Sequence, residues 1–300
     1  MKNMSWKSTF IVIMYNNYMK NIGIILDSFC SRTKTEIEEL GFGYLSLQVV
    51  LDGKLYKDGE KLDFTESMKL IDEATDAKTS QPNAGDIENI FKEMTKKYEK
   101  VVYLCLASGM SSAFSTANAI AADFNGQVEV WDNTLVGPSY IEAAKWISNA
   151  VNEEGMSVED AKKAFDTFSN NLITWMIPER LDAIKRNGRA KKGAALLLSK
   201  FKIVPLINYK NQEIEVKGVR RGFAKAASTI VSRMKDSIKD KMNDFNIVLM
   251  YSKESTKEIM LTKLHEAGFE NVQIEMISSA IGIQAGIGSL AISAYPKKVA

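Results

Sequence analysis

Residues 101–114 read VVYLCLASGMSSAF, an apolar run that passes directly into a small, hydroxyl-rich turn. The run at 101–106 is typical of a strand buried in a parallel sheet. Helix formers with an apolar face follow at 113–124, so the turn at 108–112 connects the carboxyl end of a strand to a helix. Open α/β sheets bind ligands at this edge, where a helix amino terminus presents N–H groups to an anion. The stretch therefore predicts an α/β fold with a ligand loop at 108–112.

A second hydroxyl-rich segment lies upstream, where Lys-Thr-Ser-Gln-Pro at 78–82 precedes a predicted helix at 86–98. Taken singly, the segments have an ordinary interpretation, because Ser111 or Ser112 can serve simply as a helix N-cap. Taken together, they favour a shared crevice in which hydroxyls from two loops hold one carboxylate.

Strands and helices alternate through the first half of the chain, which predicts a parallel sheet with right-handed crossovers. The expected strands are the apolar runs at 22–26, 44–51, 101–106 and 128–131. The expected helices lie at 35–40, 63–74 (or 65–74), 86–98, 113–124 and 137–151. Residues 54–59 are expected to form a loop. A Rossmann-like α/β domain is thus predicted for 19–155, with 1–18 as an N-terminal extension.

The second half of the chain, 156–300, has a different order of elements. Its predicted strands lie at 202–208, 213–217, 246–251, 272–276 and 289–294. Its predicted helices lie at 222–238 and 255–267, with a strand-to-helix passage at 176–184 and a turn at 186–189. The first two strands flank a short turn and form a hairpin candidate. This mixed order predicts an α+β domain.

The composition is that of a soluble globular protein, with 45% hydrophobic and 25% charged residues. The formal net charge of +2 gives no sign of a nucleic-acid binder. Cys30 and Cys105 lie on or beside apolar strands, so they are interpreted as buried thiols and not as a metal or disulfide pair. The single histidine, His265, excludes a histidine-rich metal site and argues against a Ser-His-Asp triad. The apolar run at 10–14 is too short for a signal peptide or a membrane span, so a cytoplasmic protein without an anchor is expected.

The motif at 78–82, the Ser-Gly-Met-Ser segment at 108–111 and the strand end at 22–28 resemble the DegV family of fatty-acid-binding proteins. The similarity runs from Met19 to Lys298, nearly the whole chain. The Thr-Ser-Gln-Pro motif is specific, whereas Ser-Gly-x-Ser alone would be a weak signal. The resemblance implies a two-domain fold, with a Rossmann-like parallel-sheet domain followed by an α+β domain that forms the acyl-chain cavity.

The function that this resemblance implies is binding of a long-chain fatty acid between the two domains. The carrier would present the carboxylate to a separate fatty-acid kinase, which makes acyl phosphate, and would not itself be an enzyme. It would need no cofactor besides the bound lipid, and transient contact with a membrane surface is compatible with this function. A tail of about sixteen carbons would gain roughly 12 kcal/mol before the costs of binding, so the tail sets affinity and the hydroxyls set orientation. The expected tail contacts are the apolar stretches at 194–198, 203–207 and 277–283.

Carried over residue by residue, the resemblance implies eight ligand contacts. They are Thr79, Ser80, Ser108, Gly109, Ser111, Arg189, Arg220 and Gln284. Either arginine can make a bidentate contact to a carboxylate or phosphate, with a solvated surface role as the alternative for each. The loop at 282–288 departs from the family pattern, because Gln284 replaces a histidine, Ala285 a threonine and Ile287 a proline. An amide can donate a hydrogen bond to an acyl oxygen, but it carries neither a charge nor a transferable proton.

A serine hydrolase that uses Ser111 is the main alternative to a carrier. The sequence Gly-Met-Ser-Ser-Ala at 109–113 lacks the second glycine of a nucleophile elbow, and His265 lies far along the chain. A nucleotide enzyme has less support, because no Gly-x-Gly-x-x-Gly follows the first strand and no phosphate-binding loop with a lysine is present.

Overall fold

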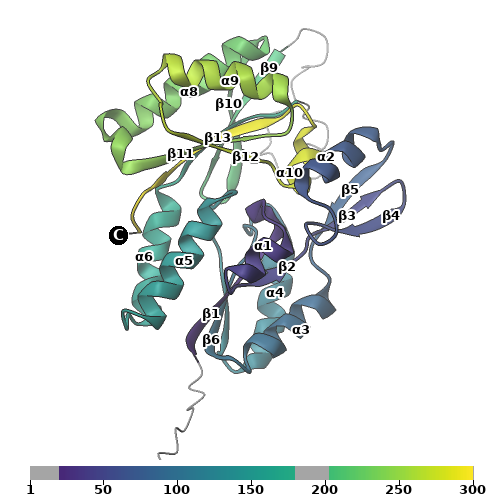
Figure 1. The fold of residues 1–300 in the computed structure, drawn as a ribbon, viewed down its shortest axis with the longest axis vertical. Helices are drawn as coiled ribbons and strands as arrows, with labels where there is room; N and C mark the ends of the chain where they lie inside the picture. Colours follow the sequence, from purple (N-terminus) through teal and green to yellow (C-terminus); the bar gives the residue numbers. More distant parts are fainter. Residues whose placement is uncertain (1–19, 180–202, 300) are drawn as a thin grey trace, which may run out of the picture.

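The computed structural model describes residues 20–179 and 203–299 (Figure 1). Their strands form three sheets, of four, six and three strands. The extension at 1–18, the turn at 186–189 and the apolar stretch at 194–198 lie outside the described residues. Within the described ranges, no helix combines the length and the apolar character needed to span a bilayer.

The first sheet is parallel throughout, which confirms the α/β class expected from the alternation of elements. In spatial order its strands are β2 (Gly43–Leu45), β1 (Lys20–Asp27), β6 (Tyr98–Leu104) and β7 (Val128–Trp131). The helices around it are α1 (Lys34–Glu39), α3 (Ala84–Met94), α4 (Ala113–Ala121) and α5 (Ser139–Asn152). Helices α3 and α4 cover one face and α5 the other, because alternate residues of β1 and β6 point to opposite sides. The carboxyl ends of these strands face the six-stranded sheet.

A three-stranded antiparallel sheet interrupts this alternation between β2 and α3. In spatial order its strands are β4 (Lys54–Lys57), β3 (Gln48–Leu51) and β5 (Ala77–Ser80), and α2 (Phe64–Glu73) connects β4 to β5. Three predictions were wrong here: 44–51 forms two strands in different sheets, 54–59 contains a strand, and the Thr-Ser-Gln-Pro segment begins within a strand. Asp52 and Gly53 explain the hairpin of β3 and β4, because both adopt positive φ, 48° and 83°, as a tight two-residue turn requires.

The six-stranded sheet of the second half pairs its strands both parallel and antiparallel, which fits the α+β class expected there. In spatial order its strands are β10 (Glu213–Arg221), β9 (Ile203–Lys210), β8 (Ile173–Ile177), β13 (Leu290–Pro296), β11 (Phe245–Tyr251) and β12 (Val272–Met276). Its helices are α8 (Phe223–Ile238), α9 (Glu254–Glu266) and α10 (Ser279–Ala285). The hairpin of β9 and β10 is confirmed, and its turn residues Asn211 and Gln212 have φ of 51° and 59°. The loop expected at 282–288 is in part helix α10, whose alanine and isoleucine side chains are buried against α2 and β5.

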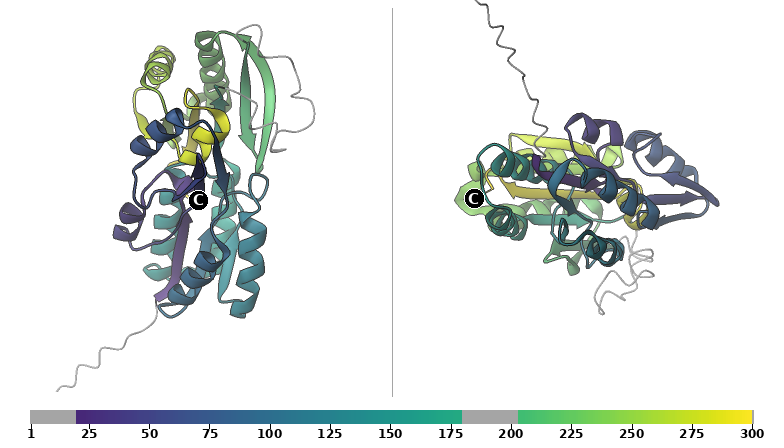
Figure 2. Two further views of the ribbon diagram at one scale, coloured as in Figure 1. Left: turned by 90° about the vertical axis from the view of Figure 1, so that its right-hand side faces the viewer. Right: turned by 90° about the horizontal axis from the view of Figure 1, so that it is seen from below.

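One apolar core extends from the parallel sheet into the six-stranded sheet, which lies beyond it along the long axis (Figure 2). Helix α6 (Val158–Asn170) contributes to both ends of this core. Phe165 packs against Trp131 of β7, with ring centroids 5.3 Å apart, and Phe168 packs against Tyr295 of β13 at 6.2 Å. Side chains from both halves share this cluster, so the domain boundary near residue 155 stays a prediction.

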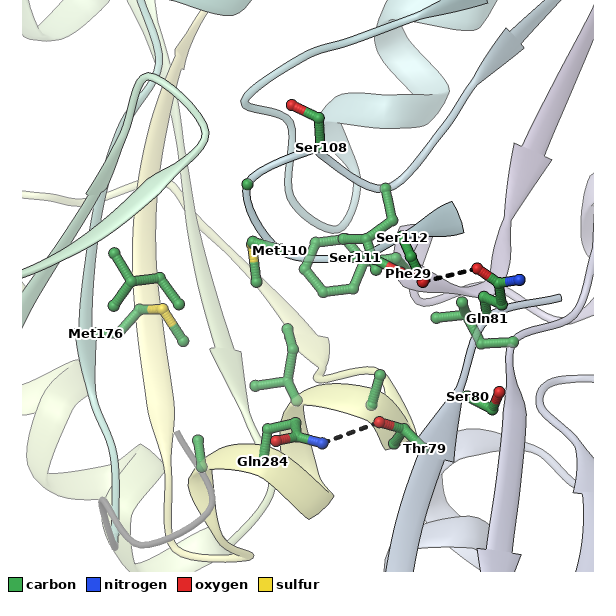
Figure 3. A pocket seen from close by; sticks show the side chains of 17 residues that line it. Phe29, Thr79, Ser80, Gln81, Ser108, Met110, Ser111, Ser112, Met176 and Gln284 are labelled. Atoms are coloured by element: carbon green, nitrogen blue, oxygen red, sulfur yellow. Dashed lines mark hydrogen bonds between the residues drawn. The ribbon is translucent and has the colours of Figure 1, made fainter. Parts of the chain in front are cut away.

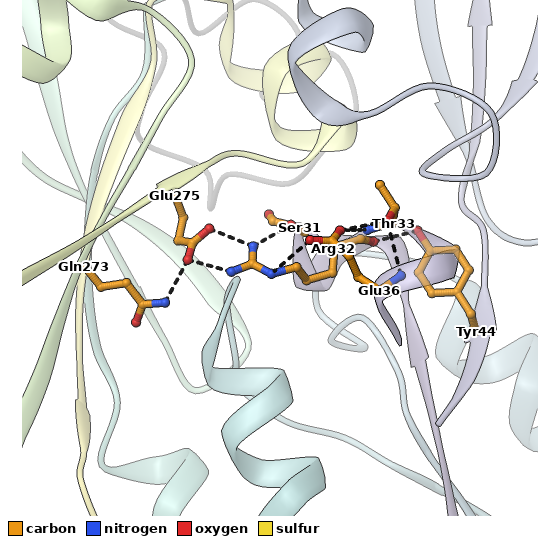
Figure 4. A network of polar contacts seen from close by, with 7 residues as sticks. All are labelled: Ser31, Arg32, Thr33, Glu36, Tyr44, Gln273 and Glu275. Carbon is orange, nitrogen blue, oxygen red and sulfur yellow. Dashed lines mark hydrogen bonds and ion pairs between the residues drawn. The ribbon is translucent and has the colours of Figure 1, made fainter. Parts of the chain in front are cut away.

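A partly buried ion pair also bridges the two halves, next to the start of α1 (Figure 4). Arg32 donates from Nη1 and Nη2 to the two carboxylate oxygens of Glu275 in β12, at 2.7 and 2.6 Å. Gln273 donates to the same carboxylate at 2.7 Å, and a capping box between Thr33 and Glu36 fixes the first turn of α1. The bidentate geometry holds the edge strand β12 against the carboxyl edge of the parallel sheet.

Candidate functional site

A pocket of about 540 Å³ lies where the carboxyl edge of the parallel sheet meets β5 and α10 (Figure 3). Its polar lining consists of Thr79, Ser80, Gln81, Ser108, Ser111, Ser112 and Gln284, with Gly109 beside them. Its apolar lining consists of Phe29, Leu47, Leu106, Met110, Met176, Ile214, Ala280, Ile281 and Ala285. Six of the eight predicted contacts therefore lie around one cavity, although they come from segments up to 205 residues apart in the chain.

No charged side chain lines this pocket among the residues that the structure describes. Its polar groups are hydroxyls, two side-chain amides and backbone groups, so an anion bound there would meet neutral donors only. The volume falls within the range of ordinary small-molecule sites, about 300–1,000 Å³.

Thr79 lies near the end of β5, opposite Val49 of β3, and faces α10. Gln284 of α10 donates from Nε2 to the Thr79 Oγ1 at 2.9 Å. Because the threonine oxygen already accepts this bond, its own proton is left to donate to a ligand. The glutamine that replaces the family histidine therefore orients a hydroxyl that the sequence had placed in the site.

Ser111 lies in the turn between β6 and α4, and its Oγ accepts a hydrogen bond from the N–H of Ala113 at 3.1 Å. This contact gives Ser111 the helix-capping role that was the alternative interpretation of the sequence. Ser112, at the N-cap position itself, makes no such side-chain bond. Capping does not exclude ligand binding, because the hydroxyl proton of Ser111 remains able to donate into the pocket.

Ser108 has a different role from the other hydroxyls of the pocket. Its N–H donates to Oδ1 of Asp132 at 2.9 Å, and its hydroxyl donates to Oδ2 of the same carboxylate. Asp132 directly follows β7, so this pair fastens the 108–112 turn to the neighbouring strand end. The hydroxyl of Ser108 is therefore engaged by the protein, while Ser80 lies exposed at the rim.

Gly109 lies against the tip of the β9–β10 hairpin, and only a glycine fits there. A Cβ at this position would lie 2.1 Å from the carbonyl oxygen of Gln212. The hairpin also supplies Ile214 to the pocket wall, so the close approach at Gly109 brings that wall into place.

If the pocket binds the fatty acid that the sequence resemblance implies, Gly109→Ala is expected to push the hairpin tip away and weaken this binding by about tenfold, because the displaced wall would bury less of the tail. Isothermal titration with a fatty acid measures the change. Gly126→Ala is the control, because Gly126 has a φ of 78° and no neighbour within 4 Å, so it should lower thermal stability without changing lipid affinity. Wild-type affinity in Gly109→Ala would show that the hairpin contact has no part in forming the pocket.

Of the two predicted arginine contacts, the one that the structure describes lies away from this pocket. Arg220 lies on β10, where its Nε donates to Thr229 Oγ1 at 2.9 Å and its Nη1 to the carbonyl of Val219 at 2.8 Å. It does not line the pocket. Arg189 lies outside the described residues.

Three buried donors converge on Asp27, a residue behind the pocket that the sequence analysis did not assign. Its carboxylate accepts from the N–H of Phe29 at 3.0 Å, the N–H of Leu106 at 2.8 Å and the hydroxyl of Tyr103 at 2.9 Å. Burial raises the pKa of Asp27 to about 6, against the opposing effect of these bonds. Since Phe29 and Leu106 both line the pocket, Asp27 holds two of its apolar walls in place.

A second buried acid, Asp58, lies beneath the start of α10. Burial raises its pKa to about 7, while the hydroxyls of Ser279 and Ser28 lie close enough to oppose the rise. Neither carboxylate oxygen has a hydrogen bond of good geometry within the described part of the chain, so this contact with the serines is a weak one. The charged form of Asp58 is therefore poorly stabilised in the folded protein.

The described lining contains no carboxylate or imidazole that could act as a base for Ser111. His265 lies in the last turn of α9 and does not line the pocket. No group of three or more metal-ligating side chains is found among residues 20–179 and 203–299. The pocket thus combines hydroxyl groups that can donate to a ligand with apolar walls, which suits an amphiphile with an anionic head.

Known proteins share both the sequence pattern and the fold. A DegV domain-containing protein of Mycoplasmopsis pulmonis is 28% identical over 273 residues, which cover 91% of this chain and 94% of that protein. The structure of a fatty-acid-binding DegV family protein from Thermus thermophilus has a TM-score of 0.80 at 22% identity, covering 92% of this chain and 99% of that one. A stearic-acid-binding protein from Eubacterium ventriosum has a TM-score of 0.79 at 19% identity, covering 92% and 98%.

The two structural likenesses show a common fold. A family model described as "uncharacterised protein, DegV family" matches residues 21–297, which include every element of the pocket described above. Because this match spans nearly the whole sequence, the chain belongs to the DegV family.

Proposed function

We propose that this protein binds a long-chain fatty acid, with the carboxylate at Thr79 and Ser111 and the tail along the apolar lining. The observation that carries the proposal is the hydrogen bonding of these two hydroxyls. Each oxygen already accepts a hydrogen bond from the chain, so each proton is left for an anionic acceptor. The proteins from Thermus thermophilus and Eubacterium ventriosum bind a fatty acid and stearic acid, respectively, which supports the same ligand class here.

The two ends of the ligand contribute differently. Hydrogen bonds to a charged group are worth about 1.5–3 kcal/mol each, whereas each buried methylene is worth about 0.8 kcal/mol. A long tail therefore supplies most of the affinity, and the hydroxyls determine the orientation of the fatty acid in the pocket. Leu106 of the first half and Met176 of the second both line the pocket, so the tail would lie between the two sheets.

On this proposal the protein is a cytoplasmic carrier that presents the carboxylate to a separate fatty-acid kinase. Ser80, Ser108, Gly109 and Ser112 are exposed around the polar end, so a partner could reach a carboxylate held there. Phosphoryl transfer needs cations to stabilise the developing charge, and the described lining has none. The partner would therefore supply the chemistry, and transient contact with a membrane surface would allow the carrier to load.

Native mass spectrometry of the purified protein tests the proposal most directly. We expect a bound mass equal to that of a long-chain fatty acid, which is released on denaturation and exchanges with an added fatty acid of known length. An empty protein that also fails to take up added fatty acid would rule the proposal out. Hydrolysis of a fatty-acyl ester that disappears in Ser111→Ala would instead identify a serine hydrolase.

A further inference from the structure

A neutral acceptor, Gln81, connects the two segments that carry the hydroxyls of Thr79 and Ser111. Its Oε1 accepts from the hydroxyl of Ser112 at 2.8 Å and from the hydroxyl of Thr116 at 3.1 Å. Gln81 directly follows β5, whereas both donors lie at the start of α4. Figure 3 shows the bond from Ser112 to Gln81. Two lone pairs of one carbonyl oxygen are thus used to join strand β5 to helix α4.

The position of this contact relates it to ligand binding. Thr79 lies two residues before Gln81, and Ser111 lies one residue before Ser112. Strand β5 is an edge strand that pairs only with β3 within its sheet. Within the described chain, the two hydrogen bonds to Gln81 join residues 77–83 to residues 108–116 through side chains and so fix one segment relative to the other.

The chemistry of an amide suits this position better than that of an acid. A carboxylate at residue 81 would accept the same two hydroxyl protons, but it would place a negative charge beside the anionic head of a ligand. A methionine would fill a similar, unbranched volume, but its thioether is only a weak acceptor. Gln81 thus holds the hydroxyls together without changing the charge of the pocket.

We infer that Gln81 is a positioning residue that sets the separation of the Thr79 and Ser111 hydroxyls, so that both reach one carboxylate. It thereby gives the pocket its preference for a carboxylate over an uncharged head of similar size. This inference rests on the proposed function, because it concerns the selectivity of the same site. The tail contacts lie elsewhere in the pocket and do not depend on Gln81.

Comparison of decanoate with decanol tests this role, because the two ligands share a tail and differ in the head. Wild-type protein should bind decanoate more tightly, and Gln81→Met should lose about tenfold or more of that preference, the loss of one charged hydrogen bond. The affinity for decanol should stay within about twofold of wild type, because the tail contacts are retained. Isothermal titration gives both dissociation constants, and a thermal melt checks that the variant is folded.

A double-mutant cycle supplies the matched control. Ser112→Ala combined with Thr116→Val removes the same contact from the other side, so adding Gln81→Met to it should cause no further loss of preference. A wild-type acid preference in Gln81→Met, or an equal loss of decanoate and decanol, would overturn the positioning role. If the wild-type protein binds neither of these ligands nor a fatty acid of about sixteen carbons, it is the proposed function that fails.

Discussion

A chain that carries both Thr79→Val and Ser111→Ala is expected to bind a long-chain fatty acid about a thousandfold more weakly than the wild type, the loss of two charged hydrogen bonds of about 2 kcal/mol each. Each substitution removes a hydroxyl that would donate to the carboxylate, and both keep the apolar lining intact. Valine also keeps the shape of threonine, so packing against α10 is largely preserved. The dissociation constant for a fatty acid, measured by titration, is the readout.

The corresponding fatty alcohol separates the head from the tail in this experiment. Its affinity should change little, because the carboxylate is the group that uses both donors. Ser115→Ala is the matched hydroxyl deletion: Ser115 is exposed on α4, donates to the carbonyl of Ser112 and does not line the pocket. If the double variant binds fatty acid as the wild type does, the carboxylate is held somewhere else.

Substitution Asp58→Asn is expected to stabilise the protein at pH 8 by about 4 kcal/mol and to have almost no effect at pH 4. The folded protein holds the proton of Asp58 more tightly than the unfolded chain does, because burial raises the pKa from 3.8 to about 7. Wild-type stability therefore falls as the pH rises from about 4 to about 7, at up to about 1.4 kcal/mol per unit, and then levels off. Asparagine stays neutral at every pH and avoids this loss. Urea unfolding at the two pH values measures the difference.

Asp27→Asn is the informative comparison for this experiment, because Asp27 is also buried with a raised pKa. Its carboxylate accepts three hydrogen bonds, and an amide nitrogen would face at least one of those donors. We therefore expect Asp27→Asn to destabilise the protein by about 2 kcal/mol at pH 4. The loss should be smaller at pH 8, because the pKa of about 6 means that ionisation of Asp27 lowers the stability of the wild type there. A loss of stability in Asp58→Asn at pH 8 would mean that the Asp58 carboxylate is well solvated by its serine neighbours after all.

The place of the candidate pocket could be predicted from the sequence because local order determines it. A strand, a small turn and a helix at 101–124 put Ser111 at the carboxyl edge of a parallel sheet, wherever the other strands lie. The family motif then added Thr79. The hairpin of β3 and β4 was missed although its signal, the Asp-Gly pair at 52–53, is one of the strongest that a short sequence carries.

Other parts of the site depend on contacts that no local pattern encodes. Gln81 meets Ser112 and Thr116 across 31 and 35 residues of chain, and only the packing of β5 beside α4 brings them together. Arg220 carries a suggestive charge, but its strand directs it to Thr229. The buried acids Asp27 and Asp58 could not be distinguished from surface acids, because burial is a property of the assembled fold.

The part of the pocket lining that the structure describes is uncharged, so dissolved ions find no fixed charge to screen there. Ionic strength weakens attraction between separated charges, as in proteins that hold an anion with lysine or arginine. Here short dipolar contacts to hydroxyl protons would hold the head, and such contacts scarcely respond to salt. If the proposed function is right, the protein would keep a bound fatty acid equally well in dilute and in concentrated salt.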